Sequence, residues 1–270
     1  MIKRVLKLAI SLGFWTIDAS ARRLQSVLGK RRPGTCTVLY YHVVTDQQRE
    51  RFAGQMDMLL KLARPISLEG PIALEPGKHH VAVTFDDAFR ESLRNALPEL
   101  EKRDIPATVF VPTGCLGQPA PWLTKEEYAA HGGVVLSADE LKELAKRPSV
   151  SLGSHCITHR PLPTLSDAEA RDEIFLSKSE LESILCKPVG MLSWPHGAHE
   201  HKHVALARDA GYRHLFSIEP ALAFKDRDEF VVGRVRVDPL DWRLESGLKV
   251  AGAYRWLPVL HEFQRSRRSQ

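Results

Sequence analysis

Short apolar runs rich in β-branched residues alternate with segments of helical periodicity along most of this 270-residue chain. The predicted strands cover residues 35–41, 81–85, 107–111, 150–154, 189–194, 214–218 and 230–237. Strands separated by helices at this spacing form parallel βα units, and six or seven such units favour closure into a barrel. The sequence therefore predicts one α/β barrel domain over residues 35–245, with its chemistry on the loops that follow the strands.

Two of the predicted helices begin with a capping box, in which a serine precedes a glutamate by three residues. Ser137 with Glu140 opens one helix, and Ser166 with Glu169 opens the next. Between the strands at 107–111 and 150–154 lies a loop, 112–134, that is rich in Gly and Pro. Because a loop of this length on a compact domain usually covers a site, we expect it beside the functional residues.

Most of the positive charge lies at the start of the chain. Residues 1–33 hold eight Lys or Arg and one Asp, a net charge of +7, whereas the whole chain carries +5, so the remainder carries −2. A nucleic-acid-binding domain normally carries its positive charge on the folded body with aromatic residues interleaved, which this distribution excludes. We expect residues 1–33 to bind an anionic membrane surface instead.

The apolar run at residues 8–17 is too short to cross a bilayer, which requires about 20 residues. Residues 1–34 are therefore expected to form a basic amphipathic helix at the membrane interface of a cytoplasmic protein. Two alternatives stay open: a helix packed on the domain, and a signal peptide cleaved near residues 19–21 for export. Residues 246–270 are expected to form a basic helical tail.

The predicted strand at 81–85 ends in two adjacent carboxylates, Asp86 and Asp87. Like charges at neighbouring positions repel each other, so a site that holds both usually includes a cation. The pair can then divide into a metal ligand and a proton acceptor. The alternative is that one aspartate caps the following helix and the other is solvated.

Two histidines, His155 and His159, follow the predicted strand at 150–154. Residues four apart project to the same side if the segment turns helically, which is a common way for two imidazoles to share a metal. The spacing alone arises by chance, but the carboxylate pair is also expected at a strand exit. One carboxylate and two imidazoles leave an open position for water, so the sequence predicts one divalent catalytic metal, with zinc expected.

These residues belong to a longer pattern that resembles the polysaccharide deacetylases, carbohydrate esterase family four. Residues 84–89 (TFDDAF) and 154–159 (SHCITH) are similar to the first two motifs of that family, and 194–197 (WPHG) to its third. Residues 39–42 and 105–111 are similar to two of its strands. The resemblance covers residues 36–240, in the order of the family.

The resemblance implies a distorted (β/α)7 barrel that uses a divalent metal to remove N-acetyl groups, less often O-acetyl groups, from an acetylated carbohydrate. By position it implies Asp87, His155 and His159 as metal ligands and Asp86 as the base that takes a proton from the attacking water. The backbone N–H of His196 is expected to donate to the oxyanion.

Three departures from the family pattern concern the surroundings of these residues. Cys156 lies where the family has Ser or Thr, and Trp194 and His196 replace residues that are often Tyr. The arginine that holds the base in some members is expected to be absent, with Ser193 near its place. The orientation of Asp86 therefore stays open.

The amine that leaves the sugar amide also requires a proton donor. His42 is expected in this role, because it ends the first strand and closure of the barrel brings the first and last strands together. A structural histidine hydrogen-bonded at the rim is the alternative. His261 is the only late candidate, and its basic, helix-like surroundings indicate a surface residue.

Weaker patterns lie elsewhere in the chain. His199, His201 and His203 resemble a metal cluster, but alternating histidines at a helix start are typical of a solvated face. Residues 238–242 have the form of a fourth family motif that supports a catalytic histidine, or else form a plain turn. Trp122 either stacks on a sugar ring or packs as part of a lid.

The predicted function is that of a metal-dependent hydrolase acting on the N-acetyl groups of a polysaccharide, glycolipid or lipid-linked sugar. The alternative is a degenerate barrel that binds glycans without turnover. The four residues Asp86, Asp87, His155 and His159 favour the enzyme, because a binding module has no reason to keep a proton acceptor beside three metal ligands. The identity of the sugar and the oligomeric state stay open.

Overall fold

The computed structural model describes residues 2–29, 32–226 and 228–259. Its helices are α1 Ile2–Val27, α2 Arg49–Leu62, α3 Arg90–Glu101, α4 Lys125–His131, α5 Ala138–Leu144, α6 Asp167–Leu185, α7 His201–Asp209 and α8 Arg243–Val250. Its strands are β1 Thr35–Tyr41, β2 Arg64–Pro65, β3 His79–Phe85, β4 Ala107–Val111, β5 Val150–Ser154, β6 Met191–Ser193, β7 His214–Phe216, β8 Val231–Val232 and β9 Arg234–Arg236.

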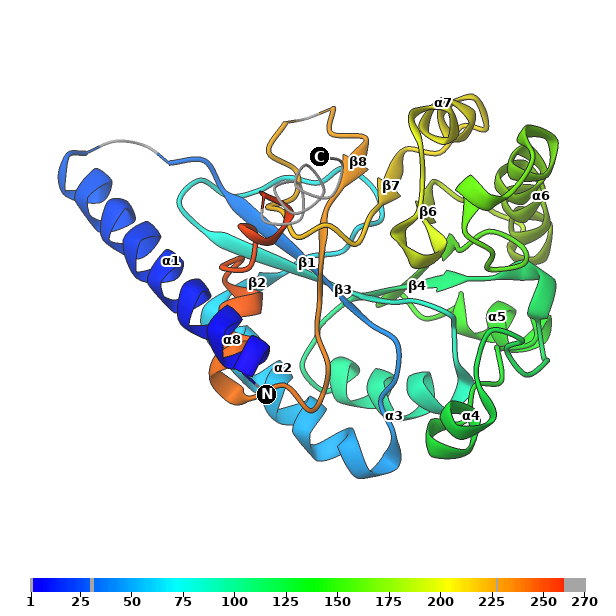
Figure 1. Ribbon diagram of the computed structural model, residues 1–270, viewed down its shortest axis with the longest axis horizontal. Helices are drawn as coiled ribbons and strands as arrows, with labels where there is room; N and C mark the ends of the chain where they lie inside the picture. Colours follow the sequence, from blue (N-terminus) through cyan, green and yellow to red (C-terminus); the bar gives the residue numbers. More distant parts are fainter. Residues whose placement is uncertain (1, 30–31, 227, 260–270) are drawn as a thin grey trace.

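All the strands pair in parallel, and helices α2 to α7 surround the sheet (Figure 1). The order along the main sheet is β8-β7-β6-β5-β4-β3-β1-β9. The predicted α/β architecture is therefore confirmed, and the two capping boxes at Ser137 and Ser166 begin α5 and α6 as predicted.

The last predicted strand, 230–237, is divided into two short strands that pair with opposite edges of the sheet. In β8, Val231 lies opposite Leu215 of β7, whereas in β9 Arg234 lies opposite Val38 of β1. No ladder joins β8 to β9, so the sheet is not a closed barrel. Gly233 alone separates the two strands, however, and this connection brings the first and last strands together as predicted.

Alternate residues of the strands belong to two different apolar layers. In β1, Cys36 and Val38 pack inside the curved sheet, and Leu39 and Tyr41 pack outside it against the helices. This alternation follows from the two-residue period of a strand whose two faces are both covered. It leaves the ends of the strands as the place where polar side chains can converge. We refer to that end as the mouth of the barrel.

Two predicted boundaries differ from the structure. The loop 112–134 contains α4, which begins with its own capping box at Thr124. The boundary predicted at residue 245 falls inside α8, which packs against α2 and β1, so the start of the predicted tail belongs to the barrel domain. The rest of that tail, residues 260–270 with His261, lies outside the described residues.

Candidate active site

A sharp turn after β3 sends the two adjacent carboxylates in different directions. The backbone N–H of Asp86 continues the ladder by donating to the carbonyl of Tyr41 at 3.0 Å. Asp87 then adopts a left-handed conformation with φ of 68°, and Ala88 has φ of 50°. Such conformations are uncommon for residues other than glycine and asparagine, and they cluster at functional sites. Both carboxylates are buried.

Asp87 faces the two predicted histidine ligands. Its Oδ1 atom lies 3.1 Å from Nε2 of His159 and 3.7 Å from Nε2 of His155. One ligand atom from each of the three residues lies within 4.8 Å of the others. All three side chains are buried, so the structure brings together the ligand set that the sequence predicted.

The orientation of His155 is fixed from the opposite side of its ring. Its Nδ1 atom lies 2.7 Å from the carbonyl oxygen of Ser193, which leaves Nε2 directed toward Asp87. A hydrogen bond to a carbonyl at one ring nitrogen is the usual way in which a protein sets the tautomer of a metal-binding histidine. Burial also lowers the pKa of His155 to about 4, so the neutral, metal-binding form is favoured.

Glu173 of α6 holds the loop between the two histidines. Its Oε2 atom accepts from the backbone N–H groups of Ile157, at 2.7 Å, and Thr158, at 3.0 Å, and its Oε1 atom accepts from the Thr158 hydroxyl. The loop contains two further left-handed residues, Cys156 and His159. Glu173 therefore satisfies the backbone of a turn whose conformation is otherwise unfavourable, a role that no sequence motif indicated.

Asp86 is held by a buried arginine, Arg234 of β9. Nη1 of Arg234 lies 2.7 Å from Oδ1 of Asp86, and Nη2 lies 2.8 Å from Oδ2. The same guanidinium donates to the hydroxyls of Ser193 and Thr84 and to the carbonyl of Ser217. The expectation that no arginine holds the base is therefore wrong. Ser193 does lie at the predicted place, as a partner of Arg234.

The surrounding charges keep both carboxylates ionised. Burial raises the pKa of Asp86, but the Arg234 guanidinium and His155 outweigh burial, and the pKa lies well below its usual value. For Asp87, burial is likewise outweighed by His159, which lowers the pKa. The site therefore presents one carboxylate with a fixed cationic partner and one that faces only imidazoles.

The donor set at Asp87, His155 and His159 fits a divalent cation. Oδ1 of Asp87 is buried and has no hydrogen bond of acceptable geometry within the described residues, although Nε2 of His159 lies 3.1 Å away. Such an orphaned buried oxygen requires a compensating partner. Two neutral imidazoles and one carboxylate are ligands that catalytic zinc sites use.

His196 and His42 lie at the mouth, as predicted. The exposed His196 has φ of 56°, and its ring lies 4.7 Å from the ring of His159 in an edge-on arrangement. His42 follows β1 and is half-buried, and a positive charge on it would lower the pKa of both aspartates. It lines a cleft of about 470 Å³ together with other polar side chains, among them Thr45, Gln47, Arg51, His131, Arg236 and Asp238.

Two tryptophans pack against histidines near the site. The Trp122 ring, in the predicted loop, stacks on the His159 ring with 4.0 Å between the ring centroids, which agrees with the packed alternative rather than with a surface free for a sugar. Trp194 is fully buried and stacks on His199. His203, expected on a solvated face, is also buried and accepts from the backbone N–H of Glu200.

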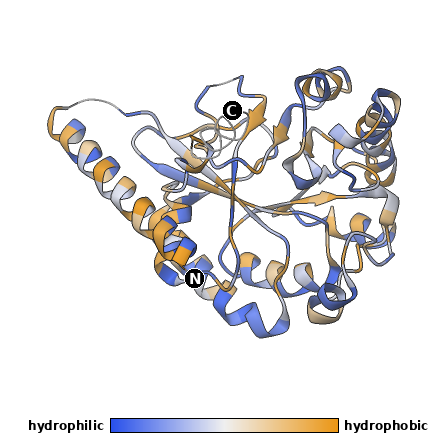
Figure 2. Cartoon of the chain, in the orientation of Figure 1, coloured by the Kyte–Doolittle hydropathy of each residue, from blue (hydrophilic) through white to orange (hydrophobic). Residues whose placement is uncertain are grey.

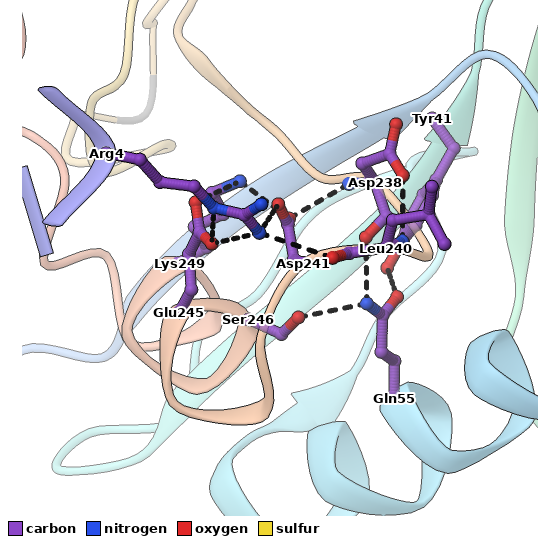
Figure 3. Close-up of polar contacts among 9 residues, drawn as sticks. All are labelled: Arg4, Tyr41, Gln55, Asp238, Leu240, Asp241, Glu245, Ser246 and Lys249. Atoms are coloured by element: carbon purple, nitrogen blue, oxygen red, sulfur yellow. Dashed lines mark hydrogen bonds and ion pairs between the residues drawn. The ribbon is translucent and has the colours of Figure 1, made fainter. Parts of the chain in front are cut away.

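Residues 238–242 form a turn that ties several helices together (Figure 3). Gln55 of α2 donates to the carbonyl of Asp238 and to Ser246 of α8, and Asp241 pairs with Lys249 at 2.6 Å. Neither aspartate bonds to a histidine within the described parts of the chain. The segment therefore matches the interpretation as a turn.

Comparisons with known proteins agree with this geometry. The profile of the polysaccharide deacetylase family matches residues 73–215, which include both aspartates and both histidine ligands but neither His42 nor Arg234. A Bacillus subtilis protein, YxkH, named as a polysaccharide deacetylase, is 27% identical over 165 residues, which are 61% of this chain and 54% of that protein. A Staphylococcus aureus poly-β-1,6-N-acetyl-D-glucosamine N-deacetylase is 25% identical over 170 residues, covering 59% and 55% of the two chains.

The chain thus spans about half the length of the curated relatives it matches. Among solved structures, the Streptococcus pyogenes deacetylase PplD superposes with a TM-score of 0.65 at 21% identity, covering 81% of this chain and 99% of that one. IcaB from Ammonifex degensii gives a TM-score of 0.64 at 22% identity, covering 83% and 98%. These two share the fold. Because the family profile matches more than half of its residues, this chain belongs to the polysaccharide deacetylase family.

Proposed function

We propose that this protein is a metal-dependent hydrolase that removes N-acetyl groups from a polysaccharide, an oligosaccharide, a glycolipid or a lipid-linked sugar. The observation that carries the proposal is the buried set Asp87, His155 and His159 beside an ionised Asp86. A deacetylase hydrolyses the amide of the acetylated sugar, and this set supplies the groups that amide hydrolysis needs.

The three-residue set would hold a divalent cation, for which we infer zinc from the mixed imidazole and carboxylate ligands. When bound, the cation supplies Lewis-acid polarisation of the acetyl carbonyl and acidifies the attacking water. Arg234 is not free to supply this charge, because it is engaged by Asp86.

Asp86 would take the proton from the water that attacks the acetyl carbon. Its two hydrogen bonds to Arg234 fix the carboxylate plane, so that the carboxylate does not rotate freely. Holding a general base in position contributes typically about 100- to 10,000-fold to rate. The backbone N–H of His196 is the proposed donor to the oxyanion of the tetrahedral intermediate.

The intermediate then breaks its C–N bond, and the sugar nitrogen must gain a proton to leave as an amine. His42 is the proposed donor, because it directly follows β1, a positive charge on it acts on both aspartates, and it lines a cleft. The products are acetate and the free amino sugar. The cleft that His42 shares with Arg51, Arg236 and Asp238 is large enough for further sugar units.

The second candidate is a barrel that binds glycans without turnover. The buried ion pair between Arg234 and Asp86 argues against this second candidate. Such a pair is costly to desolvate, and a module that only binds glycans gains nothing from it. Released acetate distinguishes the two functions.

The experiment is acetate and formate release from a panel of N-acetylated and N-formylated substrates, including β-1,6-linked and β-1,4-linked glucosamine oligomers and lipid-linked sugars. We expect zinc-loaded protein to release one acetate per new amine on at least one substrate class, and Asp86→Asn to abolish the release. Asp172→Asn, an exposed aspartate on α6, is the matched control. Glycan binding without acetate release would favour the binding module.

A further inference from the structure

Helix α1 contacts the barrel through polar side chains and through Leu8 and Phe14. Arg4 pairs with Glu245 at 2.6 Å and lies over the Trp242 ring at 4.5 Å, as part of the network in Figure 3. At intervals of two turns along the same face, Ser11 accepts from Nε1 of Trp256, and Asp18 pairs with Arg255 at 2.9 Å. Spacings of seven residues place Arg4, Ser11 and Asp18 on one side of the helix.

Large apolar side chains are exposed along α1, whose ribbon carries hydrophobic colour interrupted by hydrophilic residues (Figure 2). An amphipathic helix on a soluble domain normally turns its apolar side to the core and its charges to water. Here large apolar side chains are also turned outward, with Ile2 86% exposed and Ile17 74% exposed. We define the outward face of α1 by its exposed large apolar side chains, which are Ile2, Val5, Leu6, Ile10, Leu12, Ile17, Leu24 and Val27. None of the other described helices exposes a comparable run.

Further exposed apolar side chains lie in the turn before α8 and in its first residues. Leu240 and Trp242 contact Arg4 where α1 meets the barrel, and Leu244 follows in α8. Leu240 also lines the cleft that contains His42. Exposed apolar side chains are therefore present both along α1 and at the rim of that cleft.

Exposed basic residues accompany the apolar surface. Lys3 and Lys7 are exposed beside Leu6 at the start of α1, and Arg23 is exposed near its end. No described helix is long and apolar enough to cross a bilayer. A helix that exposes an apolar side flanked by basic residues, and that is too short or too polar to cross a bilayer, is typical of a segment that lies in a membrane interface.

We propose that the outward face of α1, with Leu240, Trp242 and Leu244, docks on an anionic bilayer surface and holds the mouth of the barrel beside that surface. A second copy of the chain is the less suitable occupant, because two such faces would bring Lys3, Lys7 and Arg23 of both copies together. Anionic lipid headgroups complement the same charges. The proposal does not depend on the catalytic activity.

Vesicle co-sedimentation of the full-length protein tests this docking. Wild-type protein is compared on neutral phosphatidylcholine vesicles and on vesicles that contain phosphatidylglycerol, at low and high salt. The test variant is Leu6→Gln/Ile10→Gln/Ile17→Gln, which keeps the charge. The matched control is Leu60→Gln/Leu176→Gln, which changes two exposed leucines on α2 and α6. Equal unfolding midpoints establish that each variant is folded.

We expect salt-sensitive binding to the anionic vesicles, at least about 10-fold weaker for the triple variant and unchanged for the control. Equal binding by wild type and the triple variant, or no preference for anionic vesicles, would overturn the proposal. So would a lipid-free wild-type dimer that becomes a monomer in the triple variant.

Fluorescence quenching by brominated lipids then tests the orientation. Trp242 is exposed in the turn before α8, whereas Trp15, midway along α1, lines a cleft beside Asp18 and Arg255. We expect Trp242→Phe to reduce the quenching more than Trp15→Phe does, while vesicle binding persists in both variants. If Trp242→Phe leaves the quenching unchanged, the mouth does not lie at the bilayer surface.

Discussion

Arg234 and Asp86 form a buried, two-bond ion pair inside the barrel, with Nη1 to Oδ1 at 2.7 Å and Nη2 to Oδ2 at 2.8 Å. The arginine comes from the last strand and the aspartate from β3, which β1 separates in the sheet. Because β9 pairs with β1, the connection through Gly233 that brings the sheet edges together also delivers the guanidinium to the base. Fold closure and the proposed catalytic geometry therefore depend on the same segment.

Replacing Arg234 should affect stability and turnover separately. Arg234→Met leaves the Asp86 carboxylate buried without its partner, which should lower the free energy of unfolding by about 3–5 kcal/mol. Arg234→Lys keeps a charge but cannot make two parallel bonds, so it should retain more stability and still lose most turnover. Urea unfolding and acetate release measure the two effects. Arg236→Met, on the exposed end of the same strand, is the control for stability and should change it little.

The two adjacent aspartates should have different effects when changed. Asp86→Asn should keep the metal and lose turnover by about 100- to 10,000-fold, because only the proton acceptor is removed. Asp87→Ala should lose both the metal and the turnover. Metal content after dialysis, measured beside acetate release, separates the roles. Near-normal turnover by Asp86→Asn would refute the assignment of the base.

Glu173 should influence metal binding without touching the metal. Glu173→Gln loses the charge that accepts the Ile157 and Thr158 backbone N–H groups, so the loop that carries His155 and His159 should loosen. Changes behind metal ligands typically weaken metal affinity by about 10- to 100-fold. Competition with a chromogenic chelator measures the affinity. Asp172→Asn, at the exposed neighbouring residue, should leave the metal affinity unchanged. An unchanged metal affinity in Glu173→Gln would mean that the loop keeps its conformation without Glu173.

His42 should matter most when the leaving group needs a proton. His42→Ala should lose about 100-fold or more on an N-acetyl sugar, but much less on an activated aryl acetate whose leaving group departs unprotonated. The ratio of the two losses is the measurement. His131→Ala, at another residue that lines the same cleft, should change the turnover of both substrates alike. Equal losses of turnover on both substrates for His42→Ala would mean that His42 positions the substrate or supports the fold and does not donate the proton.

The sequence predicted a metal site of one carboxylate and two imidazoles because two independent patterns, the aspartate pair and the His-x-x-x-His spacing, both follow strands. The choice of Asp87 rather than Asp86 as the ligand came from the family resemblance. Parallel strands end at one edge, so these residues had to meet once the strands were recognised. The alternation of strands and helices was likewise sufficient to predict the α/β fold class.

Arg234 was missed because one sequence does not show which way a short strand faces. A signal was present nonetheless, since Val235 and Val237 alternate with Arg234 and Arg236. The two valines pack in the outer layer, so the arginines face the barrel interior. The sequence also did not show that residues 230–237 form two strands on either side of Gly233. The first half pairs with β7 and the second with β1, and these strands are far apart in the sequence.

No sequence pattern predicted the role of Glu173 or which side of α1 faces the barrel. Glu173 is one of several acidic residues on α6, and only the folded turn at 155–159 shows which of them is buried. The apolar pattern of α1 was visible, but the side that faces the barrel is decided by the partners Glu245, Trp256 and Arg255. These contacts join opposite ends of the chain.

Metal removal and return tests the central claim, that Asp87, His155 and His159 hold the catalytic cation, most directly. Chelator-treated, dialysed protein should contain no metal and release no acetate from an N-acetylated substrate on which the untreated protein is active. One equivalent of zinc should restore the release, and the His155→Ala/His159→Ala variant should neither bind the equivalent nor recover. Full acetate release by metal-free protein, or stoichiometric zinc retained by the double variant, would contradict the account.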